Sequence, residues 1–208
     1  MQYLDTKTRG KFIVLYGPNN IGKSTQIGML ASRIITEYHE QVLLVKYPIY
    51  GLEPTGPEIK RNIKNSSKRI KRIPDLNLQK LYAQNRKDFQ NVLETCLKSG
   101  VHVIAEDYIG TGIAWGMTKG IEHNKLLEIN NYLLIPDVSI LLDGERFKGS
   151  IEKHHIFENA GDEVWNKNRK IHLKLAKIYK WKKVRSDNPK EKVHEDIWKV
   201  VNKEFKLH

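Results

Sequence analysis

Eight consecutive residues near the N-terminus have the types and spacing that bind phosphate. Residues 17–24 read Gly-Pro-Asn-Asn-Ile-Gly-Lys-Ser, which fits the pattern G-x-x-x-x-G-K-[ST] at every fixed position. Glycines let successive backbone N–H groups point at phosphate oxygens, and a helix that begins here adds its dipole. In this pattern Lys23 reaches the β- and γ-phosphates, and the hydroxyl of Ser24 ligates Mg²⁺. We therefore expect a magnesium-bound nucleoside triphosphate to contact the following residues: Gly17, Asn20, Ile21, Gly22, Lys23, Ser24 and Thr25.

The elements around this loop are those of an α/β protein. Apolar runs of strand length lie at residues 11–16, 42–45, 101–105, 137–142 and, more weakly, 181–184. Helical patterns lie between them, at residues 23–38, 78–97 and 190–205. The first of these helices is expected to bury one side, made of Ile27, Leu30, Ala31, Ile34 and Ile35. Near-continuously apolar strands that alternate with helices predict a five-stranded parallel sheet with helices on both faces.

Length and composition narrow the class of protein. The chain has 208 residues, of which 39% are hydrophobic, and we expect a single domain over residues 1–208. No apolar run approaches the ~20 residues of a membrane-spanning helix. The single cysteine, Cys96, excludes an internal disulfide framework and cysteine-based metal clusters. These features, with no secretory pattern at the start, predict a soluble, cytoplasmic protein.

The charge balance is strongly basic. The chain has 36 Lys and Arg against 24 Asp and Glu, a formal net charge of +12. Such an excess fits anionic partners, which include nucleic acid, a membrane surface and small phosphorylated molecules, or a merely solvated basic surface. Two crowds of basic residues, at 60–72 and 167–185, keep a nucleic-acid-binding P-loop ATPase as a remote alternative.

Further short segments follow the loop in a fixed order. They are Tyr47-Pro48, residues 81–86, Glu106-Asp107-Tyr108, residues 111–115, 133–137 and 141–143, and residues 193–197. In this order and spacing, from about residue 11 to the C-terminus, the chain resembles the thymidylate kinases among the P-loop nucleoside monophosphate kinases. The resemblance implies a three-layer P-loop kinase fold with a short lid at about 144–160. It also implies transfer of the γ-phosphoryl group of ATP to dTMP with Mg²⁺, nucleotide ligands and a homodimer.

Two pairs of residues with helical spacing are assigned to the acceptor nucleotide by this resemblance. Tyr82 and Arg86 lie four apart, so on a helix they share a face. The resemblance implies that the Tyr82 ring stacks on the acceptor base and that Arg86 hydrogen-bonds the polar edge of the base. Thr111 and Trp115, also four apart, lie in the segment that closes over the base. A half-buried tyrosine, a surface arginine or a core tryptophan would fit the same residue types.

Several single residues complete the expected nucleotide contacts. The resemblance implies that Tyr47 and Pro48 border the base pocket and that Tyr108 lies near the deoxyribose, where its ring crowds out a 2′-hydroxyl. Asn19 stands where the family often has an acidic residue, and its amide can still hydrogen-bond the 3′-hydroxyl of the sugar. Arg185 lies in a segment that resembles the loop beside adenine.

Charged residues at the strand ends are expected to serve the transfer step. Glu106 ends the third strand, where open parallel sheets bind ligands, and its carboxylate can hold a water on Mg²⁺ or merely cap the next helix. Asn20 is not the arginine that some family members use to stabilise the transition state. Arg146, Lys148 and Lys153, in the expected lid, are therefore our candidates for neutralising the transferring phosphoryl group.

One residue departs from the family pattern by a reversal of charge. The family usually carries, at the position of Asp107, an arginine that binds the acceptor phosphate. An aspartate would repel that phosphate, so other cations must replace the arginine, for example Lys46, Lys60 or Arg61. A deoxynucleoside kinase, whose acceptor is uncharged, and another nucleoside monophosphate kinase are therefore the alternative functions.

Overall fold

Five parallel strands form the centre of the computed structural model, which describes residues 9–64, 73–147, 149 and 161–205. Their order across the sheet is β2-β3-β1-β4-β5. The strands are β1 Phe12–Tyr16, β2 Val42–Lys46, β3 His102–Glu106, β4 Val138–Asp143 and β5 Lys182–Arg185. Neighbouring strands are parallel at all four pairings, which confirms the predicted sheet.

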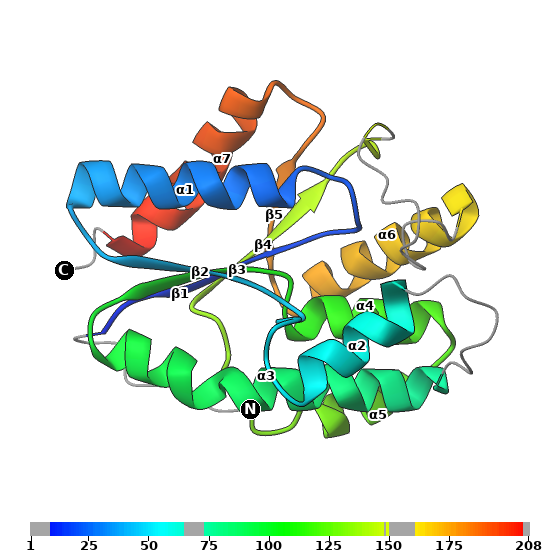
Figure 1. The fold of residues 1–208 in the computed structure, drawn as a ribbon. Coiled ribbons are helices and arrows are strands. Elements are labelled where there is room, and N and C mark those ends of the chain that lie inside the picture. The colour runs from blue at the N-terminus through cyan, green and yellow to red at the C-terminus, as the bar shows by residue number, and fades with distance from the viewer. Residues whose placement is uncertain (1–8, 65–72, 148, 150–160, 206–208) are drawn as a thin grey trace.

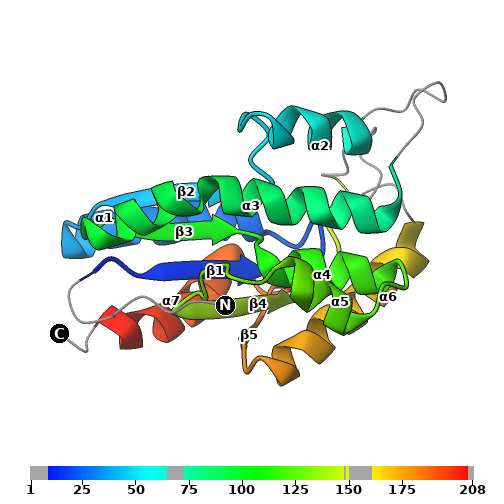
Figure 2. The same cartoon turned by 90° about the horizontal axis from the view of Figure 1, so that it is seen from below.

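Helices cover both faces of this sheet (Figure 1). Helices α1 Lys23–Tyr38 and α7 Lys190–Phe205 lie on one face. The other face carries α3 Asp75–Lys98, α4 Ile109–Thr118 and α6 Gly161–Ile178. Helix α2 Thr55–Lys64 packs on α3, and α5 His123–Ile129 packs on α4, farther from the sheet (Figure 2). The three layers are those of the expected fold.

The side chains of β1 alternate between two apolar cores. Phe12, Val14 and Tyr16 belong to the core under α3, α4 and α6. Ile13 and Leu15 belong to the core under α1 and α7. All five residues are buried, so β1 holds the phosphate-binding loop that follows it on a rigid base.

Helix α1 has the predicted bounds, but one member of its predicted buried side is exposed. Ile27, Leu30, Ala31 and Ile34 are buried, whereas Ile35 is 49% exposed. Ile35 is about 100° around the helix from Ile34, because an α-helix has 3.6 residues per turn. It therefore lies on the flank of the buried stripe, beside the edge strand β2, and the prediction for this residue was wrong.

Four helices, α2, α4, α5 and α6, were not predicted. Helix α4 is the most informative, because glycines make it a poor helix by propensity. These glycines allow close packing instead. A Cβ atom at Gly110 would lie 2.3 Å from the Trp181 ring, and one at Gly112 would lie 2.5 Å from Nη2 of Arg86. Glycine thus brings α4 against α3 and against Trp181, the residue just before β5.

None of the helices within the described ranges combines the length and apolar character that crossing a membrane requires.

Candidate active site

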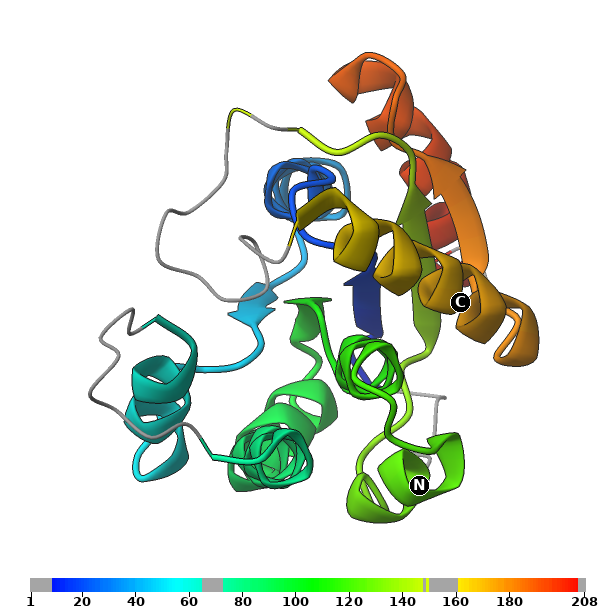
Figure 3. The ribbon, with the colours of Figure 1, turned by 90° about the vertical axis from the view of Figure 1, so that its right-hand side faces the viewer.

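A cavity of about 690 Å³ lies at the carboxyl ends of the strands, the usual ligand site of open parallel sheets. Figure 3 looks onto this edge of the sheet. The cavity wall combines the phosphate-binding loop, the ends of β2 and β3, helices α3 and α4, and the segment after β5. Of the residues predicted from the sequence, the wall includes Asn19, Asn20, Ile21, Gly22, Lys23, Ser24, Thr25, Tyr47, Pro48, Tyr82, Arg86, Glu106, Tyr108, Thr111 and Trp115.

The phosphate-binding loop has a backbone that only certain residues adopt. Gly17, Asn20 and Gly22 have φ angles of 148°, 61° and 92°. A Cβ atom at Gly17 would lie 2.8 Å from the carbonyl oxygen of Leu142, so that position also needs glycine for space. Asparagine is among the few other residues that adopt positive φ readily. The loop therefore turns tightly, and the N-terminus of α1 at Lys23 opens into the cavity.

Two contacts hold the loop from the side of the expected lid. The indole N–H of Trp165, in α6, donates to the carbonyl oxygen of Asn19 at 2.8 Å. The backbone N–H of Phe147 donates to the carbonyl oxygen of Asn20, also at 2.8 Å. The phosphate-binding loop is thus connected to Phe147, near the start of the expected lid, and to Trp165, just after its end.

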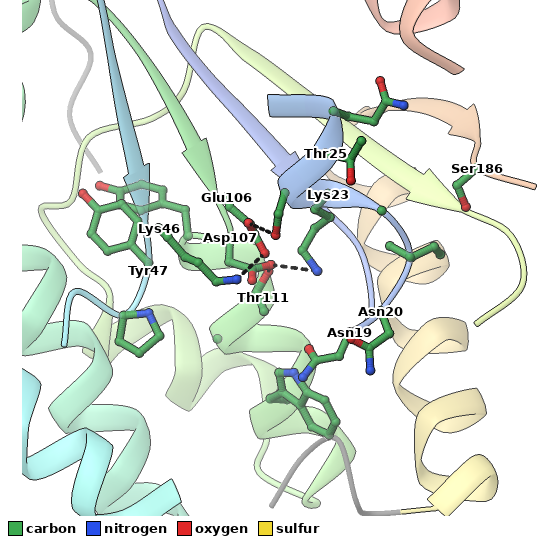
Figure 4. Close-up of a pocket in the computed structure, with 18 of the residues that line it drawn as sticks. Asn19, Asn20, Lys23, Thr25, Lys46, Tyr47, Glu106, Asp107, Thr111 and Ser186 are labelled. Atoms are coloured by element: carbon green, nitrogen blue, oxygen red, sulfur yellow. Dashed lines mark hydrogen bonds and ion pairs between the residues drawn. The ribbon is translucent and has the colours of Figure 1, made fainter. Parts of the chain in front are cut away.

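The ammonium group of Lys23 is buried at the centre of the loop, where the side chain is 4% exposed. It donates to the carbonyl oxygens of Gly17 and Pro18, each at 3.0 Å. Its Nζ also lies 3.6 Å from Oδ1 of Asp107 (Figure 4). The positive charge is therefore concentrated where the sequence pattern expects phosphate.

Ser24, Glu106 and Lys46 form a hydrogen-bonded row across two strand ends and the loop. Ser24 Oγ donates to Oε2 of Glu106 at 2.6 Å, and Lys46 Nζ donates to Oε1 at 2.9 Å. Burial opposes ionisation of Glu106, but Lys23, Lys46 and the hydrogen bond from Ser24 outweigh it and hold the pKa of this carboxyl below its usual value. A serine hydroxyl next to an ionised carboxylate is an oxygen donor set that suits Mg²⁺.

Asp107 begins the turn into α4 with a φ angle of 63°. Its Oδ1 accepts a hydrogen bond of 2.7 Å from Oγ1 of Thr111, one helical turn later. Burial raises the pKa of Asp107, and the nearby carboxylate of Glu106 adds to the rise, while Lys23 opposes it. Asp107 therefore links the phosphate-binding loop to the helix that carries Thr111 and Trp115.

At the other end of the cavity, the guanidinium group of Arg86 is buried. Its side chain projects from α3, is 5% exposed, and donates from Nη1 to Oδ1 of Asn130 at 2.8 Å. Among the described residues no carboxylate forms an ion pair with it, and its Nε has no hydrogen-bond partner. Burial lowers its pKa, although nearby tyrosines oppose this effect. Tyr82 and Trp115 belong to one small apolar cluster, and both line the cavity together with Arg86.

The rings of Tyr47 and Tyr108 pack deep beside this end of the cavity. Tyr108 is 0% exposed and packs edge-on against Phe12, with ring centroids 5.1 Å apart. It also packs against Tyr47 at 5.0 Å. Tyr108 therefore packs as a core residue and also lines the cavity, and its role beside the deoxyribose stays a prediction.

Of the four basic residues predicted beside adenine and in the lid, the structure describes two. Arg185 projects outward, pairs with Asp187 at 2.6 Å and is not in the cavity wall. The side chain of Arg146 is 6% exposed, and its Nη1 lies 3.4 Å from Oδ1 of Asp162 in α6. Lys148 and Lys153 lie outside the described residues, as does most of the expected lid. The roles of all four stay predictions.

Several residues in the wall were not predicted as site residues. They include Gln79, Phe147, Ser186, Asn188 and Lys190. Ser186 directly follows Arg185 and Asn188 comes two residues later, so the segment expected beside adenine reaches the cavity wall through these two residues. Lys46 is also in the wall, whereas Lys60 and Arg61 are exposed on α2 and are not.

Comparison with known proteins identifies relatives that match most of the chain. A model of the thymidylate kinase family matches residues 15–197. A protein named probable thymidylate kinase, from Pyrococcus abyssi, is 33% identical over 209 residues, which cover 95% of this chain and 98% of that protein. Among solved structures, a thymidylate kinase from Candida albicans has a TM-score of 0.81 at 22% identity, covering 96% of this chain and 95% of that chain. The comparison with this solved structure shows that the two chains have the same fold.

Proposed function

The chain belongs to the thymidylate kinase family, and from this premise we propose that it transfers the γ-phosphoryl group of ATP to dTMP, giving dTDP and ADP. It is a phosphotransferase. The observation that carries the proposal is that one cavity joins a complete phosphate-binding loop to a pocket with Tyr82, Arg86 and Trp115. Donor and acceptor can therefore meet at the carboxyl ends of β1 and β3.

The donor side relies on preorganised positive charge. The N–H groups of the loop and the N-terminus of α1 point at the site of the β- and γ-phosphates. Lys23 exchanges its two carbonyl partners for phosphate oxygens, which are stronger acceptors because they are charged. Mg²⁺, which we propose is held by Ser24 and through water by Glu106, supplies further neutralisation of the phosphate charge.

The acceptor side relies on shape and directed hydrogen bonds. The Tyr82 ring offers a stacking surface for the base. Arg86 has no carboxylate partner among the described residues, so its N–H groups can serve a carbonyl oxygen of the base. A phosphate oxygen is already a competent nucleophile, so this chain needs no strong base, and catalysis rests on positioning and charge neutralisation.

The developing charge on the transferring group needs cations from both sides. Lys23 serves from the loop. We assign Arg146, Lys148 and Lys153 to the opposite side, because they belong to the segment where the family places its lid.

A panel of acceptors tests the proposal. ADP release from ATP with Mg²⁺ is measured with dTMP, dUMP, the other nucleoside monophosphates and thymidine, each offered separately. We expect turnover with dTMP and weaker turnover with dUMP. Turnover with thymidine but not with dTMP would contradict the proposal.

A deoxynucleoside kinase is the second candidate function. The observation that favours it is Asp107, whose carboxylate lies 3.6 Å from Lys23 where a negatively charged acceptor must approach. An uncharged acceptor meets no such repulsion. The thymidine arm of the same panel decides between the two functions.

We also propose that the protein acts as one kinase domain over residues 1–208, as a homodimer in the cytoplasm and without a nucleic-acid partner. Family membership and the extent of the family match support this proposal. Light scattering of the purified chain measures its mass in solution, and a monomeric mass would contradict the dimer.

A further inference from the structure

The acceptor phosphate needs a cation that the family pattern does not provide in this chain. The family's arginine is replaced by Asp107, which is 15% exposed and bound by Lys23 and Thr111. Its negative charge faces the point where donor and acceptor phosphates meet. If dTMP is the acceptor, as proposed above, another group must offset this charge, because like charges brought together repel each other.

The cavity wall narrows the choice of cation. Within the described part of the chain, it contains four basic side chains, which are Lys23, Lys46, Arg86 and Lys190. Lys23 is held by the loop and belongs to the donor. Lys190 begins α7, which packs against β4 and β5, at the opposite side of β1 from β2. Arg86 lies next to Gly112 and lines the cavity with Tyr82, at the end that we assign to the nucleobase.

Of these four side chains, only Lys46 lies on the side of β2, close to where the donor and acceptor phosphates meet. It ends β2 in register with Glu106, and its Nζ lies 2.9 Å from Oε1 of that carboxylate. The other oxygen of Glu106 binds Ser24, so Lys46 is two hydrogen bonds from the phosphate-binding loop. The neighbouring wall residues Tyr47 and Pro48 continue from Lys46 toward the base end.

The chemistry of Lys46 suits a phosphate. An ammonium group has three N–H donors, so it can hold Glu106 and a phosphate oxygen together. Its side chain is 61% exposed and can adjust to the acceptor, while Glu106 keeps its end near the loop. Lys60 and Arg61, the other replacements considered from the sequence, are exposed on α2 and outside the wall.

We propose that Lys46 binds the phosphate of the acceptor nucleotide and thereby replaces, from the neighbouring strand, the arginine that the family carries at position 107. Lys46 and Asp107 then carry opposite charges and have different roles. The carboxylate is turned toward Lys23 and Thr111, and the acceptor phosphate lies on the side of Lys46. This inference rests on the proposed function.

Binding of dTMP and of thymidine separates the phosphate from the rest of the acceptor. Calorimetry measures both dissociation constants for the wild type, Lys46→Met, Lys46→Arg and the control Lys87→Met, which removes an exposed lysine of α3 outside the cavity wall. We expect Lys46→Met to weaken dTMP about 10- to 100-fold, as loss of a charged hydrogen bond does, and to change thymidine less than about twofold. Lys46→Arg should recover most of the dTMP affinity, and Lys87→Met should match the wild type.

Thymidine binding also reports on whether Lys46→Met is folded. An unchanged ratio of dTMP to thymidine affinity in Lys46→Met would overturn the inference, whether both affinities fall together or neither falls. A wild type that binds dTMP no better than thymidine would instead overturn the proposed function, since its acceptor phosphate would not be recognised at all.

Discussion

The carboxylate of Asp107 lies 3.6 Å from the ammonium group of Lys23, so an acidic residue at the end of β3 directly faces the lysine of the phosphate-binding loop. The same carboxylate accepts a hydrogen bond from Thr111 in α4. The side chain of Asp107, at the end of β3, therefore joins the phosphate-binding loop to helix α4. This contact gives the site a charge distribution that the family pattern does not predict.

Replacing Asp107 by asparagine should improve acceptor binding. Asparagine tolerates the φ angle of 63° and can still accept a hydrogen bond from Thr111, but it carries no charge that repels the acceptor phosphate. We expect the KM for dTMP to fall about tenfold and the affinity for thymidine to stay the same. Steady-state kinetics measures the first and calorimetry the second. A higher KM for dTMP would show that the carboxylate itself supports acceptor binding.

Removing the charge of Lys23 should abolish most activity without unfolding the protein. Lys23→Met keeps the length of the side chain, and the lost ammonium group interacts with loop carbonyls and one carboxylate. We expect kcat to fall at least about 100-fold, the usual loss when a preorganised donor to the transition state is removed. Circular dichroism checks that the fold is kept. A folded variant with near wild-type kcat would remove Lys23 from the catalytic machinery.

The Arg86→Met variant should lose activity but not thermal stability. The guanidinium group is buried with no carboxylate partner among the described residues, and burial of such a charge costs stability. We expect kcat/KM for dTMP to fall about 10- to 100-fold while Tm stays at or above that of the wild type. Kinetics and a thermal melt are measured on the same preparation. Unchanged kinetics would take Arg86 out of the acceptor site, and a much lower Tm would assign it a structural role.

His172 should make the fold sensitive to acid. This side chain of α6 is fully buried, and burial lowers its pKa from 6.5 to about 3. Between these values the unfolded chain binds a proton that the folded chain does not, so the free energy of unfolding falls as the pH drops from 6.5 toward 3.

The His172→Gln variant isolates this contribution. We expect its free energy of unfolding to depend less on pH, with a slope lower by up to about 1.4 kcal/mol per pH unit below pH 6. Urea denaturation at pH 7, 6 and 5 measures the slopes for both proteins. Because the slope is compared rather than the absolute value, a general loss of stability in the variant does not affect the test. Equal slopes would mean that His172 is protonated in the folded state.

The phosphate-binding loop and the sheet were predictable because their signals are local. The motif fixes Gly17, Gly22, Lys23 and Ser24 within eight residues, and β1 is an apolar run of strand length directly before it. The bounds of α1 followed from the same kind of pattern. Ile35 did not, because periodicity shows which side of a helix is apolar but not how far the neighbouring layer extends over it.

The missed features depend on contacts between distant parts of the chain. Helix α4 is rich in glycine, and its stability comes from packing against Trp181, Arg86 and other residues that no local pattern connects. Asn130, the partner of Arg86, lies 44 residues away in sequence. Likewise, Lys46 was one of three possible cations until the sheet register set it beside Glu106. These residues are far apart in the sequence and meet only in the folded chain.

The most direct test of the account is binding of a bisubstrate compound in which adenosine and thymidine are joined by a chain of five phosphates. If one cavity holds both nucleotides, the compound should bind once per chain and inhibit competitively against ATP and against dTMP. Lys23→Met should weaken it, because both halves meet at that residue. Competition against only one of the two substrates would contradict a shared cavity.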